Sequence, residues 1–185
     1  MAGKSPREAV DSFSGYFEET LSVISADHLT VFQTSANVYS LITQPYANVR
    51  TRQGTDLRIS VVQSVGTKRL NPKEFKATTR KYSYRLNLGE EHEVLAYHWH
   101  PDGSAVRFPH LHLRISQELG YPEIERRIHR AHYPTSRVCI EDFVLLLIDY
   151  YDVVPRMPKS QWSRILDKNK SAFEKMATWK VSARK

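Results

Sequence analysis

The chain has 185 residues, of which 41% are hydrophobic and 25% are charged. These values are typical of a globular protein with one domain. They exclude an integral membrane protein, because the longest apolar run, residues 143–148, is far shorter than the roughly 20 residues of a membrane-spanning helix. The single cysteine, Cys139, excludes an internal disulfide and a cysteine-rich zinc site. The N-terminus has no apolar core typical of a secretion signal, so we expect a cytoplasmic protein without membrane contact.

The net charge of +7 is unevenly distributed along the chain. Residues 1–27 are acidic, with two bases and five acids, whereas residues 28–78 carry seven bases and two acids. Residues 156–185 carry nine bases and two acids. Positive clusters of this kind favour binding to a phosphate backbone, although a lysine-rich helix surface that is merely solvated has the same composition.

The first half of the chain predicts a helix followed by strands. Residues 5–26 are expected to be helical, because large apolar residues recur there at steps of three and four: Val10, Phe13, Phe17, Leu21 and Ile24. Three β-branched runs, 29–35, 38–43 and 57–65, predict strands separated by turn residues. The segment 80–88 predicts a half-buried strand, since one face would carry Tyr82, Tyr84, Leu86 and Leu88.

The second half predicts two more strands, 93–100 and 110–115, and then helices over 123–132, 141–151 and 161–176. Apolar residues of the last helix should point inward: Trp162, Ile165, Leu166 and Phe173. The expected fold is therefore a single α+β domain over 1–185. It has an N-terminal helix within 1–27, an antiparallel sheet of about five to six strands within 28–115, and two to three helices within 116–185.

Histidines are concentrated in one part of the sequence. Seven of the eight lie between residues 92 and 132, and four of them form two His-x-His repeats: His98, His100, His110 and His112. Alternate residues of a strand share a face, so each repeat would place two imidazoles side by side. A tight turn at 101–104 would pair His100 with Ala105 and separate the repeats. A nine-residue loop over 101–109 would instead place His100 opposite His110 and gather all four rings.

Two kinds of chemistry follow from such a cluster. General acid–base cleavage of a phosphodiester needs a base, an acid and cations near the phosphate. The four histidines would be catalytic, and the cations expected to bind the substrate are Arg107, Arg114, Arg126, Arg130 and Arg137. The alternative is a metal site completed by Glu93 or Asp102. Cupin-type sites pair His-x-His with a following glutamate, and residues 104–106 (SAV) lack one, so we expect neither a bound metal nor a cofactor.

Three motifs resemble TumE-type proteins of bacterial toxin–antitoxin loci: YHWHP at 97–101, FPHLHL at 108–113 and IEDFV at 140–144. The resemblance covers residues 80–150, with a different histidine spacing in the second motif and a shorter loop before it. It implies a small sheet-and-helix domain, a ribonuclease role for His98, His110 and His112, and an antitoxin partner. The leading prediction is thus a metal-independent ribonuclease-like toxin that binds RNA. The alternatives are a metal-binding protein and a non-catalytic interaction module.

Overall fold

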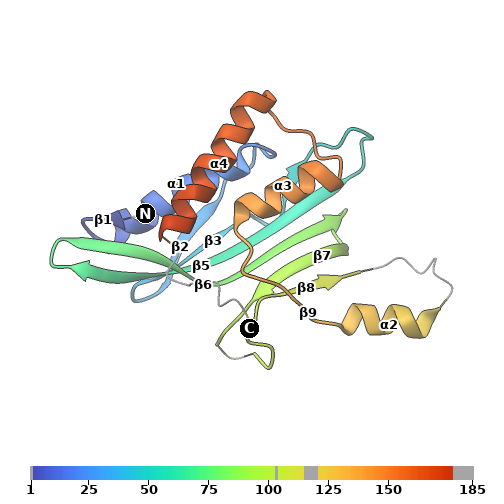
Figure 1. The fold of residues 1–185 in the computed structure, drawn as a ribbon, viewed down its shortest axis with the longest axis horizontal. Helices are drawn as coiled ribbons and strands as arrows, with labels where there is room; N and C mark the ends of the chain where they lie inside the picture. Colours follow the sequence, from blue (N-terminus) through green and yellow to red (C-terminus); the bar gives the residue numbers. More distant parts are fainter. Residues whose placement is uncertain (1, 103, 115–120, 177–185) are drawn as a thin grey trace.

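The computed structural model describes residues 2–102, 104–114 and 121–176. It confirms an α+β fold, with one helix before a large antiparallel sheet and three helices after it (Figure 1). The helices are α1 (Pro6–Leu21), α2 (Pro122–Arg130), α3 (Ile140–Tyr150) and α4 (Lys159–Met176). Across the described ranges no helix is both long and apolar enough to cross a membrane.

The sheet has nine antiparallel strands among the described residues, more than the five to six predicted. Seven of them follow the order β2 (Thr30–Ser35), β3 (Val38–Ile42), β5 (Leu57–Asn71), β6 (Glu74–Leu88), β7 (His92–Trp99), β8 (His110–Leu113) and β9 (Tyr133–Pro134). The other two are β1 (Ala2–Gly3), which pairs with β6, and β4 (Ala47–Val49), which pairs with β5. The unpredicted strands β1, β4 and β9 have only two or three residues, too few for a readable alternation.

Helices α1, α3 and α4 pack together over one face of the sheet, which we call the helix-covered face (Figure 1). Every second residue of β5 is buried there: Leu57, Ile59, Val61, Gln63 and Val65. Tyr84 of β6 points to the same side, where its ring lies 6.2 Å from Phe17 of α1 and 5.7 Å from Phe143 of α3. Because successive strand residues alternate, the residues between these point to the opposite face.

The local signals read from the sequence hold for α1. Ser5 caps it, accepting a hydrogen bond from the Glu8 amide at 3.2 Å, and Pro6 follows as the first helical residue. All five apolar residues predicted to point inward are buried, although Ile24 lies beyond the end of the helix. The last helix begins at Lys159, two residues earlier than predicted, and its residue Leu166 is buried in the core.

Two details of the predicted elements differ in the structure. Leu88 is opposite Leu57 of β5, on the same face as Tyr82 and Tyr84, but it is 43% exposed at the end of β6. The predicted helix 123–132 ends at Arg130, which frees the following residues to join the sheet. Ile115, residues 116–120 and the basic segment 177–185 lie outside the described residues.

Candidate functional site

The register between β7 and β8 decides where the histidines lie. His98 is opposite His110, and Ala96 is opposite His112. Both predicted hairpin geometries are therefore wrong. The connection is a wide loop and not the tight turn, but the strand register differs by two residues from the one expected with a nine-residue loop, in which His100 would face His110. His100 lies just beyond the end of β7, and residues 100–109 connect the two strands. Pro109 cannot donate a ladder hydrogen bond, which suits its place just before β8.

This register places five imidazoles on one surface, which we call the histidine face. The His98 ring centroid lies 5.5 Å from His100, 5.7 Å from His110 and 5.0 Å from His112. His110 and His112 are 4.9 Å apart. The neighbouring residue Tyr97 packs edge-on against Phe143 of α3, so the histidines lie on the side of the sheet opposite to α3. The structure thus brings the four predicted histidines together.

The fifth imidazole, His132, was not among the predicted site residues. Its ring lies 4.5 Å from His112 and 4.9 Å from His110. The sequence predicted His132 to lie in a helix with His129, but the chain leaves α2 after Arg130 and forms β9 beside β8. The strand pairs are His110–Pro134 and Leu111–Tyr133. One further step in the same antiparallel register brings His132 opposite His112. Pro134 was the available signal, because proline ends a helix and tolerates a sheet edge.

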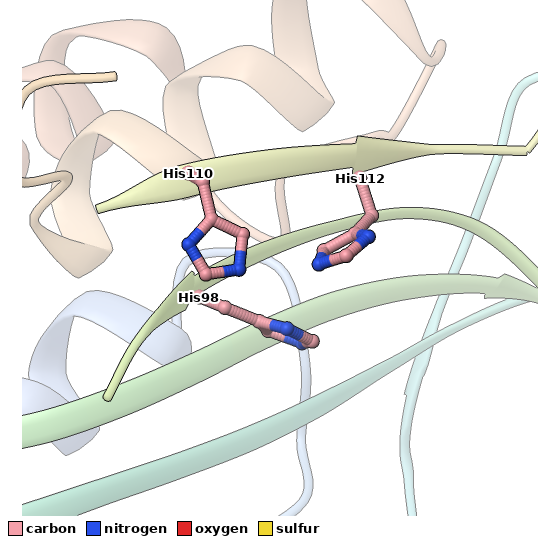
Figure 2. Close-up of side chains that lie close together, drawn as sticks. All are labelled: His98, His110 and His112. Atoms are coloured by element: carbon pink, nitrogen blue, oxygen red, sulfur yellow. The ribbon is translucent and has the colours of Figure 1, made fainter. Parts of the chain in front are cut away.

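Three of the five histidines could hold a metal ion. His98, His110 and His112 each offer one ring nitrogen, and these three atoms lie within 4.8 Å of one another (Figure 2). Zinc bonds of about 2.0–2.1 Å in a tetrahedral site place ligand atoms about 3.4 Å apart. Small rotations of the imidazole side chains supply the difference. Within the described part of the chain, no cysteine, aspartate or glutamate belongs to this group.

Hydrogen bonding orients one of these rings and leaves a buried nitrogen of another without a partner. His110 is buried, and its Nδ1 lies 2.9 Å from the carbonyl oxygen of Phe108. A carbonyl only accepts, so Nδ1 carries the hydrogen and the lone pair of the neutral ring is on Nε2. His98 Nε2 is buried without a hydrogen-bond partner among the described residues. An unpaired buried polar atom normally loses free energy, so this nitrogen is placed for a ligand.

Burial and neighbouring positive charges lower the pKa of three of these rings. Burial, followed by the charges of His112 and Arg85, lowers the pKa of His98 to about 3. Burial, followed by His132 and His110, lowers the pKa of His112 to about 4. The pKa of His100 is also lowered, first by burial and then by Lys81. At neutral pH these three rings therefore carry lone pairs that can bind a cation or accept a proton.

The predicted arginines divide into two groups. Arg114 lies next to the cluster: its charge contributes to lowering the pKa of His112, and its Nε is 3.8 Å from Glu93. Arg137 lies on the other side of the sheet, where its guanidinium carbon is 3.3 Å from the centroid of the Trp99 ring. Strand alternation points Trp99 away from its neighbour His98. Its contact with Trp99 therefore separates Arg137 from the histidine face.

The remaining predicted arginines are exposed. Arg107 is on the loop between β7 and β8. Arg126 and Arg130 are on α2, where they line a surface hollow together with Glu123 and Arg127. This helix extends beyond β9 at the end of the sheet (Figure 1).

Sequence reasoning did not select Arg85, which the structure places beside the cluster. Arg85 of β6 is opposite Ala96 of β7, and its charge contributes to lowering the pKa of His98, His100 and His112. Its Nε lies 3.6 Å from Glu93. The alternation of residues 80–88 already separated Arg85 from the tyrosines, but only the strand order shows that β6 lies beside β7.

In comparisons with known proteins, no protein-family model, no curated protein and no solved structure matches the chain.

Proposed function

We propose that this protein binds one divalent transition-metal ion, of the zinc type, through His98, His110 and His112. The observation that carries the proposal is the approach of their three ring nitrogens to within 4.8 Å of one another. The hydrogen bond from His110 Nδ1 to the Phe108 carbonyl supports it, because metal-binding histidines are usually oriented by such a bond from the other ring nitrogen. The unpartnered, buried Nε2 of His98 supports it as well.

The kind of metal follows from the ligands. Three imidazoles suit zinc and copper, whereas non-haem iron sites commonly combine two histidines with a carboxylate. Three protein ligands leave a coordination position for water, and zinc lowers the pKa of such a water to about 7. We therefore propose a metal-dependent hydrolase. His98, His110 and His112 would hold the metal, which would supply a water of lowered pKa; the water oxygen would bond to the electrophilic atom of the substrate, the bond to the leaving group would break, and the water proton would pass to the leaving group.

Cations around the site favour an anionic substrate. Arg85 and Arg114 flank the three ligands and share a single carboxylate, Glu93. His100 and His132 lie beside the three proposed ligands but are not part of that set. Positive charge next to a metal site stabilises the charge that develops when a phosphate ester is attacked. Hydrolysis of a phosphate ester is thus the reaction that the surroundings support best.

Metal binding tests the proposal directly. Chelator-treated protein is titrated with Zn²⁺ by calorimetry, and metal content is measured after gel filtration. We expect one zinc per chain, with binding weakened at least about 100-fold in His98→Ala and in His112→Ala, because loss of a ligand exceeds the 10- to 100-fold effect of an outer partner. The control is His92→Ala, since His92 is an exposed residue of the same strand, β7.

Replacing Zn²⁺ by Co²⁺ gives a second readout, because its visible spectrum reports a tetrahedral nitrogen site. Wild-type protein that binds no more zinc than the doubly substituted His98→Ala/His112→Ala protein would refute the metal centre. Circular dichroism of each variant shows whether a loss of zinc binding reflects unfolding.

The second candidate is the metal-independent ribonuclease suggested by the TumE-type resemblance, acting in the cytoplasm with an antitoxin partner. The proximity of five imidazoles and two arginines favours it. With pKa values of about 3 and 4, His98 and His112 would serve as bases at neutral pH rather than as acids. RNA cleavage that persists in excess chelator and disappears in His112→Ala would favour this candidate over the metal-dependent hydrolase.

A further inference from the structure

A row of basic side chains leads along β5 and β6 toward the histidines. Residues 67–85, most of the β5–β6 hairpin, contain seven basic residues and one acidic residue, Glu74. Five of the bases form what we call the basic row: Lys68, Lys76, Arg80, Lys81 and Arg85. Neither the metal centre nor the predicted substrate contacts use the first four of these.

The register places the basic row on the histidine face. Odd-numbered residues of β5 from Leu57 to Val65 are buried under the helices, so Ser64 and Lys68 point to the other side. Lys81 is opposite Ser64, and Lys76 is opposite Lys68. On the other side of β6, Ser83 is opposite His98. Lys81 and the His98 ring therefore share one face, with only Ser83 between them along β6.

Arg80 joins the row at an irregularity in the hairpin. The register of β5 and β6 shifts between Ser64 and Val65, which leaves Arg80 without a partner residue. Its side chain crosses Gly66, where an added Cβ would lie 2.9 Å from Arg80 Cδ. Gly66 is two residues from both Ser64 and Lys68 along the strand, so it faces the same side. Any larger residue at 66 would displace the guanidinium from the row.

The outer part of the hairpin extends beyond β3 and β7, and among the described residues only the two-residue strand β1 pairs with it there, at Phe75 and Lys76. β3 pairs with β5 only as far as Gly66, and β7 pairs with β6 only from Tyr82 inward. Figure 1 shows the β5–β6 ribbon projecting past the ends of the other long strands. In this ribbon Lys68 and Lys76 are directly opposite each other. Like charges in that position destabilise a strand pair, and a bound anion would relieve this repulsion.

Few acids neutralise the row. Arg80 lies 3.9 Å from Asp102, and Arg85 lies 3.6 Å from Glu93. Within the described ranges, Lys68, Lys76 and Lys81 have no carboxylate within ion-pair distance. By contrast Arg58, at the other end of β5, is paired with both Asp56 and Glu90. The positive charge that remains available is thus concentrated between the ribbon and the histidines.

We propose that the basic row binds the phosphate backbone of a single-stranded nucleic acid and guides it to the histidines. From Lys76 to Arg85 the row spans nine residues, about 30 Å at roughly 3.3 Å per residue. A narrow positive track that ends at rings able to stack on bases is the arrangement by which proteins hold single strands. This inference rests on the proposed function, since it names the phosphodiester of a nucleic acid as the substrate of the metal centre.

The test compares two variants of equal charge. Lys68→Ala/Lys76→Ala/Lys81→Ala removes three bases from the row. Arg52→Ala/Lys159→Ala/Arg164→Ala removes three exposed bases elsewhere. Each lowers the net charge from +7 to +4. Binding of fluorescein-labelled RNA and DNA oligonucleotides is measured by fluorescence anisotropy between about 50 and 200 mM salt, the range in which phosphate contacts have a large effect.

We expect the row variant to bind single strands on the order of 10- to 100-fold more weakly, with a salt slope smaller by about 2, since each phosphate contact in a single strand contributes about 0.7. The control variant should lose at most about twofold. Equal losses in the two variants, or no binding by the wild type, would overturn the proposal. So would tighter binding to duplex DNA or to anionic phospholipid vesicles, because the row would then serve another ligand.

The two proposals fail separately in these experiments. The row variant should bind zinc like the wild type, because none of its substitutions is a metal ligand. In the presence of chelator, wild-type protein should still bind oligonucleotides, because the basic row contains no metal ligand. Zinc binding without oligonucleotide binding would remove the nucleic-acid substrate and leave the metal centre. The reverse result would remove the metal centre and leave the track.

Discussion

The two faces of the same strands have opposite characters. On the helix-covered face, Tyr82, Tyr84 and Tyr97 pack with each other or with Phe143. On the histidine face, the residues next to them in sequence include Ser83, Arg85 and His98. One side of β6 and β7 is thus an aromatic core, and the other carries the candidate site.

A sheet built in this way can hold together a cluster of side chains whose mutual repulsion destabilises the fold. Five imidazoles and two arginines side by side repel one another whenever they are charged, and burial lowers the pKa of His98 to about 3. The strands stay in place because their alternate residues are buried under three helices. The stability of the fold and the chemistry of the site therefore depend on different residues of the same strands, and substitutions should separate the two.

The largest effect on stability is expected from Phe143→Ala. Phe143 is fully buried and contacts Tyr84 and Tyr97, so its truncation should lower the free energy of unfolding by about 3–5 kcal/mol. Urea denaturation measures the change. Tyr150→Ala is the control on the same helix, because Tyr150 is 79% exposed, and it should change stability by less than about 0.5 kcal/mol. Similar effects of the two substitutions would contradict the division between the faces.

On the histidine face, the next largest effect is expected from zinc. Zinc at a free concentration about 100 times its Kd should stabilise the folded chain by about 2.7 kcal/mol, because only the folded chain assembles the three ligands. His98→Ala should abolish this gain, and His92→Ala should keep it. Thermal denaturation with and without zinc checks both. A zinc-induced shift in Tm that survives His98→Ala would mean that the metal binds elsewhere.

Without metal, stability should depend on pH through the histidine face. Unfolded histidine has a pKa of about 6.5, whereas the pKa is about 3 for His98 and about 4 for His112. Between these values the unfolded chain binds more protons, so the contribution of both residues is present above about pH 6.5 and is lost as the pH falls toward 4. Urea denaturation in chelator should show this decline. It should be shallower in His98→Asn/His112→Asn, and an unchanged slope would mean that other groups cause the decline.

The smallest effect concerns His132. Its charge is the second cause, after burial, that lowers the pKa of His112, so His132→Ala should raise that pKa toward its ordinary value. Nuclear magnetic resonance titration of the histidine ring protons in chelator measures it. His28→Ala is the control, because His28 is exposed and precedes β2. If the pKa of His112 does not change, the charge of His132 does not act on it.

Most elements and most residues of the site could be predicted from the sequence. Periodicity identified α1, β6 and α4, because burial of one side imposes a repeat of 3.6 residues on a helix and of two on a strand. The same period of two predicted that each His-x-His repeat would share a face. It also separated Arg85 from Tyr82 and Tyr84, although nothing in the sequence showed that this arginine lies beside the histidines.

Which residues meet depends instead on the tertiary structure. The pairing of His98 with His110 depends on the length and path of the connecting loop, which carries no periodic signal. His132 joins the cluster because the chain leaves α2 after Arg130 and forms the two-residue strand β9, too short to be read from a pattern. Arg137 is drawn to Trp99 and away from the histidines. Local propensity depends on neighbours in sequence, whereas strand order and register depend on residues far apart in the chain. The sequence could therefore supply most members of the site, but not His132 or Arg85 and not the arrangement.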